Sequence, residues 1–154
     1  MKKEKFEKFT IENSTFDLER VSFDDVLNSI NPIILDTNFL FVTFQFNIDL
    51  ISQIQSLIGA TFSLYIYEGT IEELKSVERK GDKNKRYLPL IVSMLKRYNF
   101  KIITSGQTYI DNQILENLNK KVIIATNDKE LRQAIQKQGY SVLYLRQKSY
   151  LEMN

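Results

Sequence analysis

The chain alternates short apolar runs with longer segments of helical period over its 154 residues. Runs rich in β-branched or aromatic residues predict five strands, at residues 32–35, 62–67, 100–104, 121–126 and 141–145. Between them, apolar residues recur every three or four positions and predict helices, at residues 48–58, 70–77, 87–98, 109–118 and 127–139, the last capped by Asn127. Strands alternating with helices predict an α/β fold, a three-layer α/β/α domain with a mainly parallel five-stranded sheet.

Residues 1–30 do not follow this alternation. They are rich in charge, with scattered Phe and one short helix expected at residues 23–30. We expect residues 1–30 to form an N-terminal arm or cap on an α/β domain made by residues 31–154. The N-terminal lysines precede no apolar segment, and no apolar run approaches membrane-spanning length, so we expect a cytoplasmic protein without a membrane partner.

The amino-acid composition excludes several kinds of catalytic and metal-binding site. The chain has no Cys and no His. Disulfides, thiol nucleophiles, cysteine–zinc sites and catalytic imidazoles are therefore excluded. Catalysis must depend on carboxylates, Lys, Tyr or hydroxyls, with or without a metal that prefers oxygen ligands.

Acidic residues follow the predicted strands. Asp36 and Asp128 come directly after the first and fourth strands, and Glu73 and Asp111 lie near the starts of helices that follow the second and third. Because the carboxyl ends of parallel strands meet at one edge, we expect these four carboxylates to lie together. Each single Asp could instead be only a helix cap. Four clustered carboxylates repel one another, and Mg²⁺ or Mn²⁺ would neutralise them.

Three other α/β classes with acidic edges do not fit the spacing. A haloacid-dehalogenase phosphatase needs a second Asp where this chain has Asn38. A response-regulator receiver needs an Asp at the end of the third strand, where this chain has Thr104 and Ser105. A Rossmann dinucleotide site needs clustered glycines, and the five glycines here are scattered.

The motif order resembles that of the PIN-domain nucleases. The family's motifs are matched, in order, by Asp36-Thr37-Asn38, Glu73-Leu74, Asp111-Asn112-Gln113-Ile114 and Thr126-Asn127-Asp128. The resemblance runs from about Pro32 to Leu151. The stretch containing Leu131, Gly139 and Tyr144-Leu145-Arg146 is similar to the tail of archaeal PIN proteins related to the eukaryotic ribosomal-RNA-processing endonuclease.

The resemblance implies a VapC-like fold for residues 31–154 and a divalent-metal-dependent endoribonuclease that uses Mg²⁺ or Mn²⁺. The implied catalytic residues are Asp36, Glu73, Asp111 and Asp128. Among them, Asp36, Asp111 and Asp128 would bind the metal, and Glu73 would orient the attacking water. Asn38, Thr126 and Asn127 would hold the carboxylates in place.

Two details depart from the family or stay open. Many relatives have two adjacent Asp at the third motif, whereas this chain has Asn112 after Asp111, which lowers the charge of the site by one. Glu72 is an alternative to Glu73, although Glu73 matches the family position before Leu74.

Basic residues indicate where RNA would bind. From Arg79 to Lys101 there are eight Lys or Arg and one acid, Asp82. Such a run is either a solvated surface or a phosphate-binding one. We expect Lys83, Lys85 and Arg86 to contact RNA.

Two further functions remain as alternatives: a catalytically silent RNA-binding or scaffold module in ribosome assembly, and a VapC-type toxin with an antitoxin partner. Retention of four acids favours an enzyme, and the late first strand at Pro32 favours RNA processing over a toxin. We expect Phe39, Phe41, Phe44 and Phe46 to be mostly core, with some available for a homodimer surface, since the family often dimerises.

Overall fold

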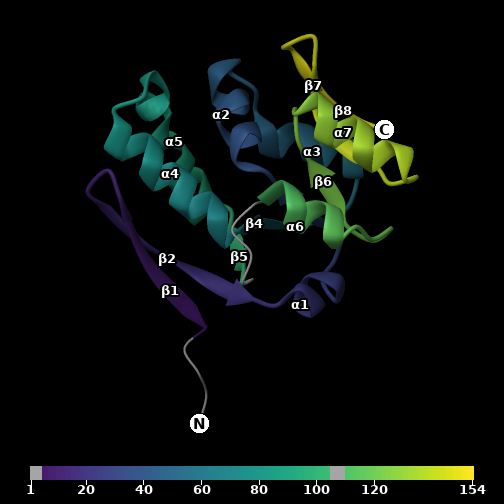
Figure 1. Ribbon diagram of the computed structural model, residues 1–154, viewed down its shortest axis with the longest axis horizontal. Helices are drawn as coiled ribbons and strands as arrows, with labels where there is room; N and C mark the ends of the chain where they lie inside the picture. The colour runs from purple at the N-terminus through teal and green to yellow at the C-terminus, as the bar shows by residue number, and fades with distance from the viewer. Residues whose placement is uncertain (1–4, 105–109) are drawn as a thin grey trace.

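The computed structural model describes residues 5–104 and 110–154 as an α/β fold (Figure 1). Its elements, in chain order, are β1 (Phe6–Ile11), β2 (Ser14–Val21), α1 (Phe23–Leu27), β3 (Pro32–Leu35), α2 (Thr37–Gln45), α3 (Leu50–Ile58), β4 (Ser63–Tyr67), α4 (Glu68–Lys80), the 3₁₀ helix η1 (Lys83–Tyr87), α5 (Leu88–Arg97), β5 (Lys101–Ile103), α6 (Ile110–Glu116), β6 (Ile123–Ala125), α7 (Lys129–Lys137), β7 (Val142–Arg146) and β8 (Tyr150–Met153).

The sheet has more strands than the sequence predicts. Its order is β1-β2-β5-β4-β3-β6-β7-β8. The five predicted strands form its parallel centre, and β2 adds to it in parallel. The antiparallel strands β1 and β8 close the two edges. The α/β class is confirmed, but the expected count of five was wrong, since the described residues form eight strands.

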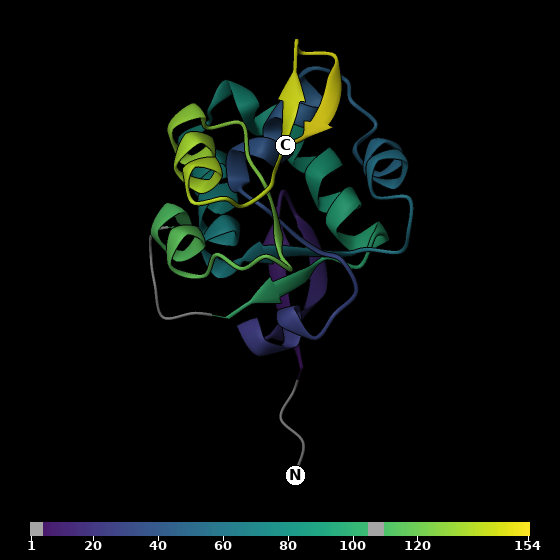
Figure 2. The same cartoon turned by 90° about the vertical axis from the view of Figure 1, so that its right-hand side faces the viewer.

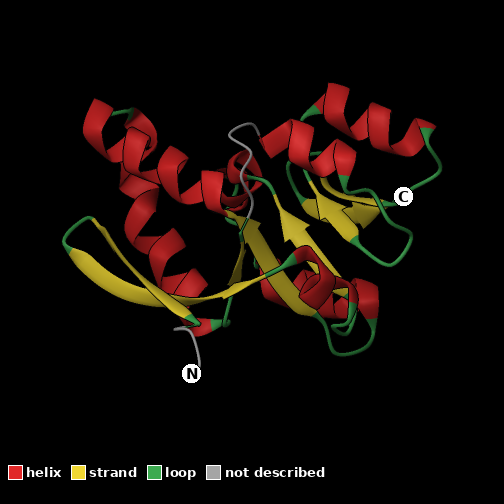
Figure 3. Ribbon diagram, turned by 60° about the horizontal axis from the view of Figure 1, so that its bottom comes forward, coloured by secondary structure: helices red, strands yellow, loops and turns green. Residues whose placement is uncertain are grey.

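Residues 6–21 form a β-hairpin within this sheet (Figure 3). Strand β1 pairs with β2 through a tight turn at Glu12 and Asn13, whose φ angles of 51° and 61° suit the twist of a two-residue hairpin. Strand β2 then pairs with β5, with Val21 opposite Ile103. The hairpin was missed because charged residues alternate with its apolar ones, which shortens every apolar run.

The sheet separates two hydrophobic clusters. Along β3, Ile33 and Leu35 join the cluster that includes buried residues of α2, α3, α4 and α5, whereas Ile34 joins the cluster that includes those of α1, α6 and α7. This alternation follows from the opposite directions of successive side chains in a strand. The view in Figure 2 shows helices on either side of the strands. The predicted three-layer arrangement is therefore present.

Helix α2 is the α-helix that the apolar periodicity did not predict. Its residues Phe39, Leu40, Phe41 and Val42 are all buried, so no polar face marks a helical period. Phe44 and Phe46 are partly buried and pack against the same cluster, which confirms the expectation that these aromatic residues are mostly core. Among the described residues, no helix is long and apolar enough to cross a membrane.

Candidate active site

Asp36 lies at the junction between β3 and α2, at the carboxyl edge of the sheet. Its backbone N–H donates to Ala125 O of the neighbouring strand β6, at 3.1 Å. Its side chain caps α2, because Oδ1 accepts the N–H of Phe39 at 2.8 Å. Its other oxygen, Oδ2, accepts the hydroxyl proton of Thr126. Asp36 is only 6% exposed, so this carboxylate is buried and held at both oxygens.

The surroundings of Asp36 favour its protonated form. Burial raises its pKa from 3.8 to about 6, against the lowering effect of the hydrogen bonds from Thr126 and Phe39, and the charges of Asp111 and Asp128 raise it further. Burial and the charge of Asp128 also raise the pKa of Asp111. The three predicted metal-binding acids therefore lie close enough to act on one another electrostatically.

Thr126 connects two of these acids. It directly follows β6 and is fully buried. While its hydroxyl donates to Asp36, its Oγ1 accepts the backbone N–H of Asp128 at 3.1 Å. Asp128 is exposed, and it caps α7 by accepting the N–H of Leu131 at 3.0 Å, so the N-cap is Asp128 and not the expected Asn127. Thr126 thus holds the buried carboxylate beside the start of α7.

Glu73 is linked to the residue after Asp36. It lies on α4, which follows β4, and its Oε1 accepts a hydrogen bond from Thr37 Oγ1 at 2.7 Å. The neighbouring Glu72 instead forms an exposed ion pair with Lys75, at 3.7 Å. Glu73, not Glu72, is therefore the acid of α4 tied to the Asp36 segment.

Thr37 is a supporting residue that the sequence did not indicate. It is 7% exposed, and its hydroxyl links α2 to α4. Its place in Asp36-Thr37-Asn38 was the available signal, but only the folded chain shows that α4 brings Glu73 within reach of it.

Within the described residues, the two predicted supporting asparagines make no hydrogen bond to the carboxylates. Asn38 is exposed and makes no hydrogen bond to any of the four carboxylates there. Asn127 Oδ1 accepts the N–H of Leu145 at 2.6 Å and so ties the start of α7 to β7. Asn127 therefore supports the backbone near Asp128 rather than a carboxylate directly.

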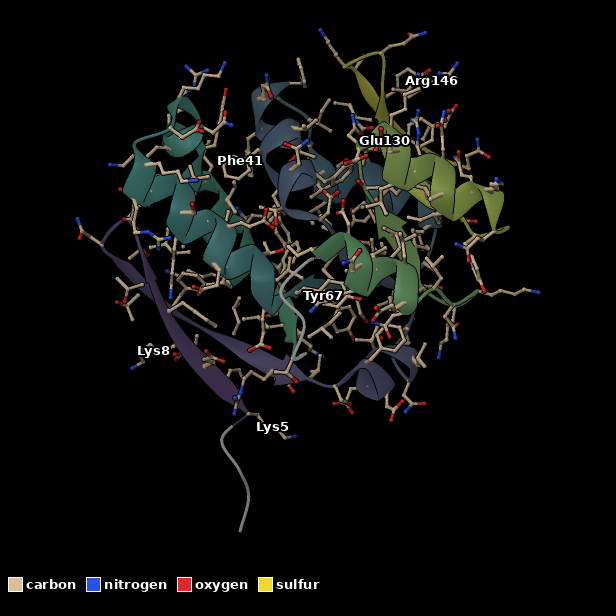
Figure 4. The ribbon with its side chains drawn as sticks, viewed as in Figure 1. Lys5, Lys8, Phe41, Tyr67, Glu130 and Arg146 are labelled. Atoms are coloured by element: carbon tan, nitrogen blue, oxygen red, sulfur yellow. The ribbon has the colours of Figure 1, made fainter. Side chains whose placement is uncertain are left out.

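The available donors suit a hard cation, although the described residues contain no converged metal site. No group of three acidic side chains there is arranged closely enough to hold an ion. The acids nevertheless offer only oxygen ligands, which Mg²⁺ and Mn²⁺ prefer. Figure 4 labels Tyr67, the last residue of β4, and Glu130, in the first turn of α7.

The predicted RNA-binding residues lie on a separate surface. Lys83, Lys85 and Arg86 are exposed on η1, beyond the C-terminal end of α4. The guanidinium group of Arg86 lies over the ring of Tyr87, 4.9 Å from its centre. Glu73 lies near the middle of α4, which ends at Lys80, so roughly 10 Å of helix separates Glu73 from the segment that carries these cations.

Comparison with known proteins identifies the family. A family model described as a PIN like domain matches residues 33–148. Ribonuclease VapC4 of Methanocaldococcus jannaschii is 33% identical over 124 residues, which are 79% of this chain and 95% of that protein. The structure of the PIN domain endonuclease Utp24 superposes with a TM-score of 0.65 at 26% identity, covering 80% of this chain and 90% of that one. The chain therefore belongs to the PIN-like domain family, and the resemblance to PIN-domain nucleases is confirmed.

Proposed function

We propose that this protein is a divalent-metal-dependent endoribonuclease that acts in RNA processing. The observation that carries the proposal is the buried carboxylate of Asp36, whose pKa is raised to about 6 by burial and by the nearby Asp111 and Asp128. A buried carboxylate that other acids repel is costly without a cation. Similarity to proteins named ribonuclease and endonuclease supports RNA as the substrate.

The proposed roles follow from the contacts. Asp36, Asp111 and Asp128 would hold Mg²⁺ or Mn²⁺, and Thr126 would fix the orientation of Asp36. Such an ion supplies Lewis-acid chemistry for phosphodiester hydrolysis without an imidazole. Glu73, oriented by Thr37, would accept a hydrogen bond from the attacking water and direct it at the phosphorus. Hydrolysis of this kind leaves a 5′-phosphate and a 3′-hydroxyl.

Asp36→Asn tests this function. The variant keeps the shape and can still cap α2, but it removes one ligand charge. We expect Mn²⁺-dependent cleavage of single-stranded RNA to be lost while the circular dichroism spectrum is unchanged. Asp49→Asn is the matched control, because Asp49 caps α3 through the N–H of Ser52 in the same way and lies outside the acidic group. Cleavage by Asp36→Asn at the rate of Asp49→Asn would refute the assignment.

A VapC-type toxin is the second candidate. The observation that favours it is the match to Ribonuclease VapC4, which covers 95% of that protein. Growth arrest on expression of the active chain, relieved by a small protein encoded beside it, would identify an antitoxin partner and a toxin. Absence of arrest at detectable expression would favour processing.

Three further expectations stay predictions. A silent RNA-binding role in ribosome assembly predicts that the wild-type protein, measured beside Asp36→Asn, binds RNA but does not cleave it. The other two are homodimer formation and a cytoplasmic location.

A further inference from the structure

A buried threonine on α4 lies behind the contact between Thr37 and Glu73. Thr70 is fully buried, one helical turn before Glu73 on the same helix. A buried hydroxyl without a partner is costly, and the hydroxyls of Thr70 and Thr37 are hydrogen bonded at 2.9 Å. Two of the three members of this chain of contacts are therefore fixed inside the protein.

Thr37 Oγ1 lies between the other two groups of this chain. The carboxylate of Glu73 can only accept, and Thr37 Oγ1 donates to its Oε1 at 2.7 Å. Thr37 Oγ1 also donates to Thr70 Oγ1 at 2.9 Å, so its one hydroxyl proton is shared between the two acceptors. The contact with the buried hydroxyl of Thr70 thus fixes where Thr37 presents its hydroxyl to Glu73.

Glu73 depends on this chain for its orientation. Its side chain is exposed, and within the described part of the chain Thr37 is its hydrogen-bond partner. An exposed glutamate otherwise samples several rotamers. We propose that Thr70 is a positioning residue, which fixes the hydroxyl of Thr37 and thereby holds the Glu73 carboxylate towards the acidic edge. The effect of Thr70 on cleavage rests on the proposed function. Its effect on the orientation of Glu73 rests on the geometry alone.

The variants separate the hydroxyl from the packing. Thr70→Val keeps the shape and removes the hydroxyl, Thr70→Ala removes it with a smaller side chain, and Thr70→Ser restores it. Thr43→Val is the matched control, because Thr43 is buried and donates to Leu40 O at 2.9 Å within α2, away from Glu73. Thermal unfolding of each variant reports whether it folds.

Single-turnover cleavage of a short single-stranded RNA with Mn²⁺ measures the effect. We expect Thr70→Val and Thr70→Ala to lower the rate at saturating protein about fivefold, as for loss of one ordinary hydrogen bond, with RNA affinity unchanged. Thr70→Ser and Thr43→Val should cleave like the wild type. In a Glu73→Gln background, Thr70→Val should cause no further loss, since the two changes interrupt one pathway.

Two results would overturn the proposal. One is that adding Thr70→Val lowers the cleavage rate of the Glu73→Gln protein by the same factor as that of the wild type. The other is a crystal structure of Thr70→Val in which Glu73 still accepts its hydrogen bond from Thr37; the expected result is loss of that contact. The crystal structure decides this even if the wild type cleaves no RNA, an outcome that would refute the proposed function without deciding the role of Thr70.

Discussion

Asp36 shows how a single residue can serve both the fold and the site. As a helix cap it stabilises α2, yet as a buried anion beside other acids it destabilises the metal-free protein. The sequence revealed its place at a strand end, because an apolar run stops there. Its partner Thr126 was also predictable from the motif, whereas the link from Thr37 to Glu73 depends on how α4 packs and could not be read along the chain.

The raised pKa of Asp36 predicts an unusual dependence of stability on pH. The folded state holds this proton more tightly than the unfolded chain, with pKa values of about 6 and 3.8. The stability that this group contributes is therefore complete below about pH 4 and is lost as the pH rises through about 6. Urea unfolding in EDTA should show this loss in the wild type, by at most about 3 kcal/mol, and a smaller loss in Asp36→Asn, where the raised pKa of Asp111 remains. Identical pH profiles for the two proteins would contradict the burial of an ionisable group here.

The same proton competes with a metal ion. Below about pH 6, Mn²⁺ must displace a proton from Asp36, so its affinity should fall by up to about tenfold per pH unit. Calorimetric titration of Mn²⁺ between about pH 5 and pH 8 measures this dependence. A constant affinity over that range would remove Asp36 from the set of ligands.

At the scale of elements, the hairpin is the main addition to the matched family region, which begins at residue 33. Its residues Ile11 and Phe16 are buried in the same cluster as α4 and α5. The backbone N–H of Glu12 also donates to Glu78 of α4 at 2.7 Å. These contacts indicate that the hairpin packs on the helix that carries Glu73 rather than extending as a free arm.

Truncation of Ile11 tests whether the hairpin is part of the folded unit. Ile11 is fully buried, so Ile11→Ala should lower the free energy of unfolding by about 2–5 kcal/mol in a single cooperative transition. Lys8→Ala, at an exposed position of the same strand, should change it by no more than about 0.5 kcal/mol. Equal, small effects of the two changes would mean that the hairpin is an independent arm.

The central elements and the edge elements differ in how far sequence could predict them. Strand β3 and its parallel neighbours are apolar on both faces, so each appears as an unbroken run. The strands β1, β2 and β8 have an exposed face, and their charged residues interrupt the pattern. The sequence pattern did not predict helix α2 for the opposite reason, because this helix is buried on nearly every side.

At the scale of the whole molecule, the proposed site at the acidic edge would have to admit a polyanion, and the cations of η1 offer a remote point of attachment. Replacing Lys83, Lys85 and Arg86 together by Ala should weaken binding of single-stranded RNA and reduce its salt slope by about two units. Metal affinity should be unchanged. Removal of three exposed lysines elsewhere, Lys8, Lys120 and Lys137, is the charge-matched control. If both triple variants bind alike, η1 is an ordinary solvated surface.

The central claim is that the acids at the carboxyl edge of the sheet hold a divalent ion. Crystals of the protein soaked in Mn²⁺ and measured for anomalous scattering test this most directly. We predict an anomalous peak within coordination distance of Asp36 and of at least one of Asp111 and Asp128, absent from crystals of Asp36→Asn. A saturating soak that leaves this edge without a peak, or that places the ion elsewhere on the molecule, would contradict the account.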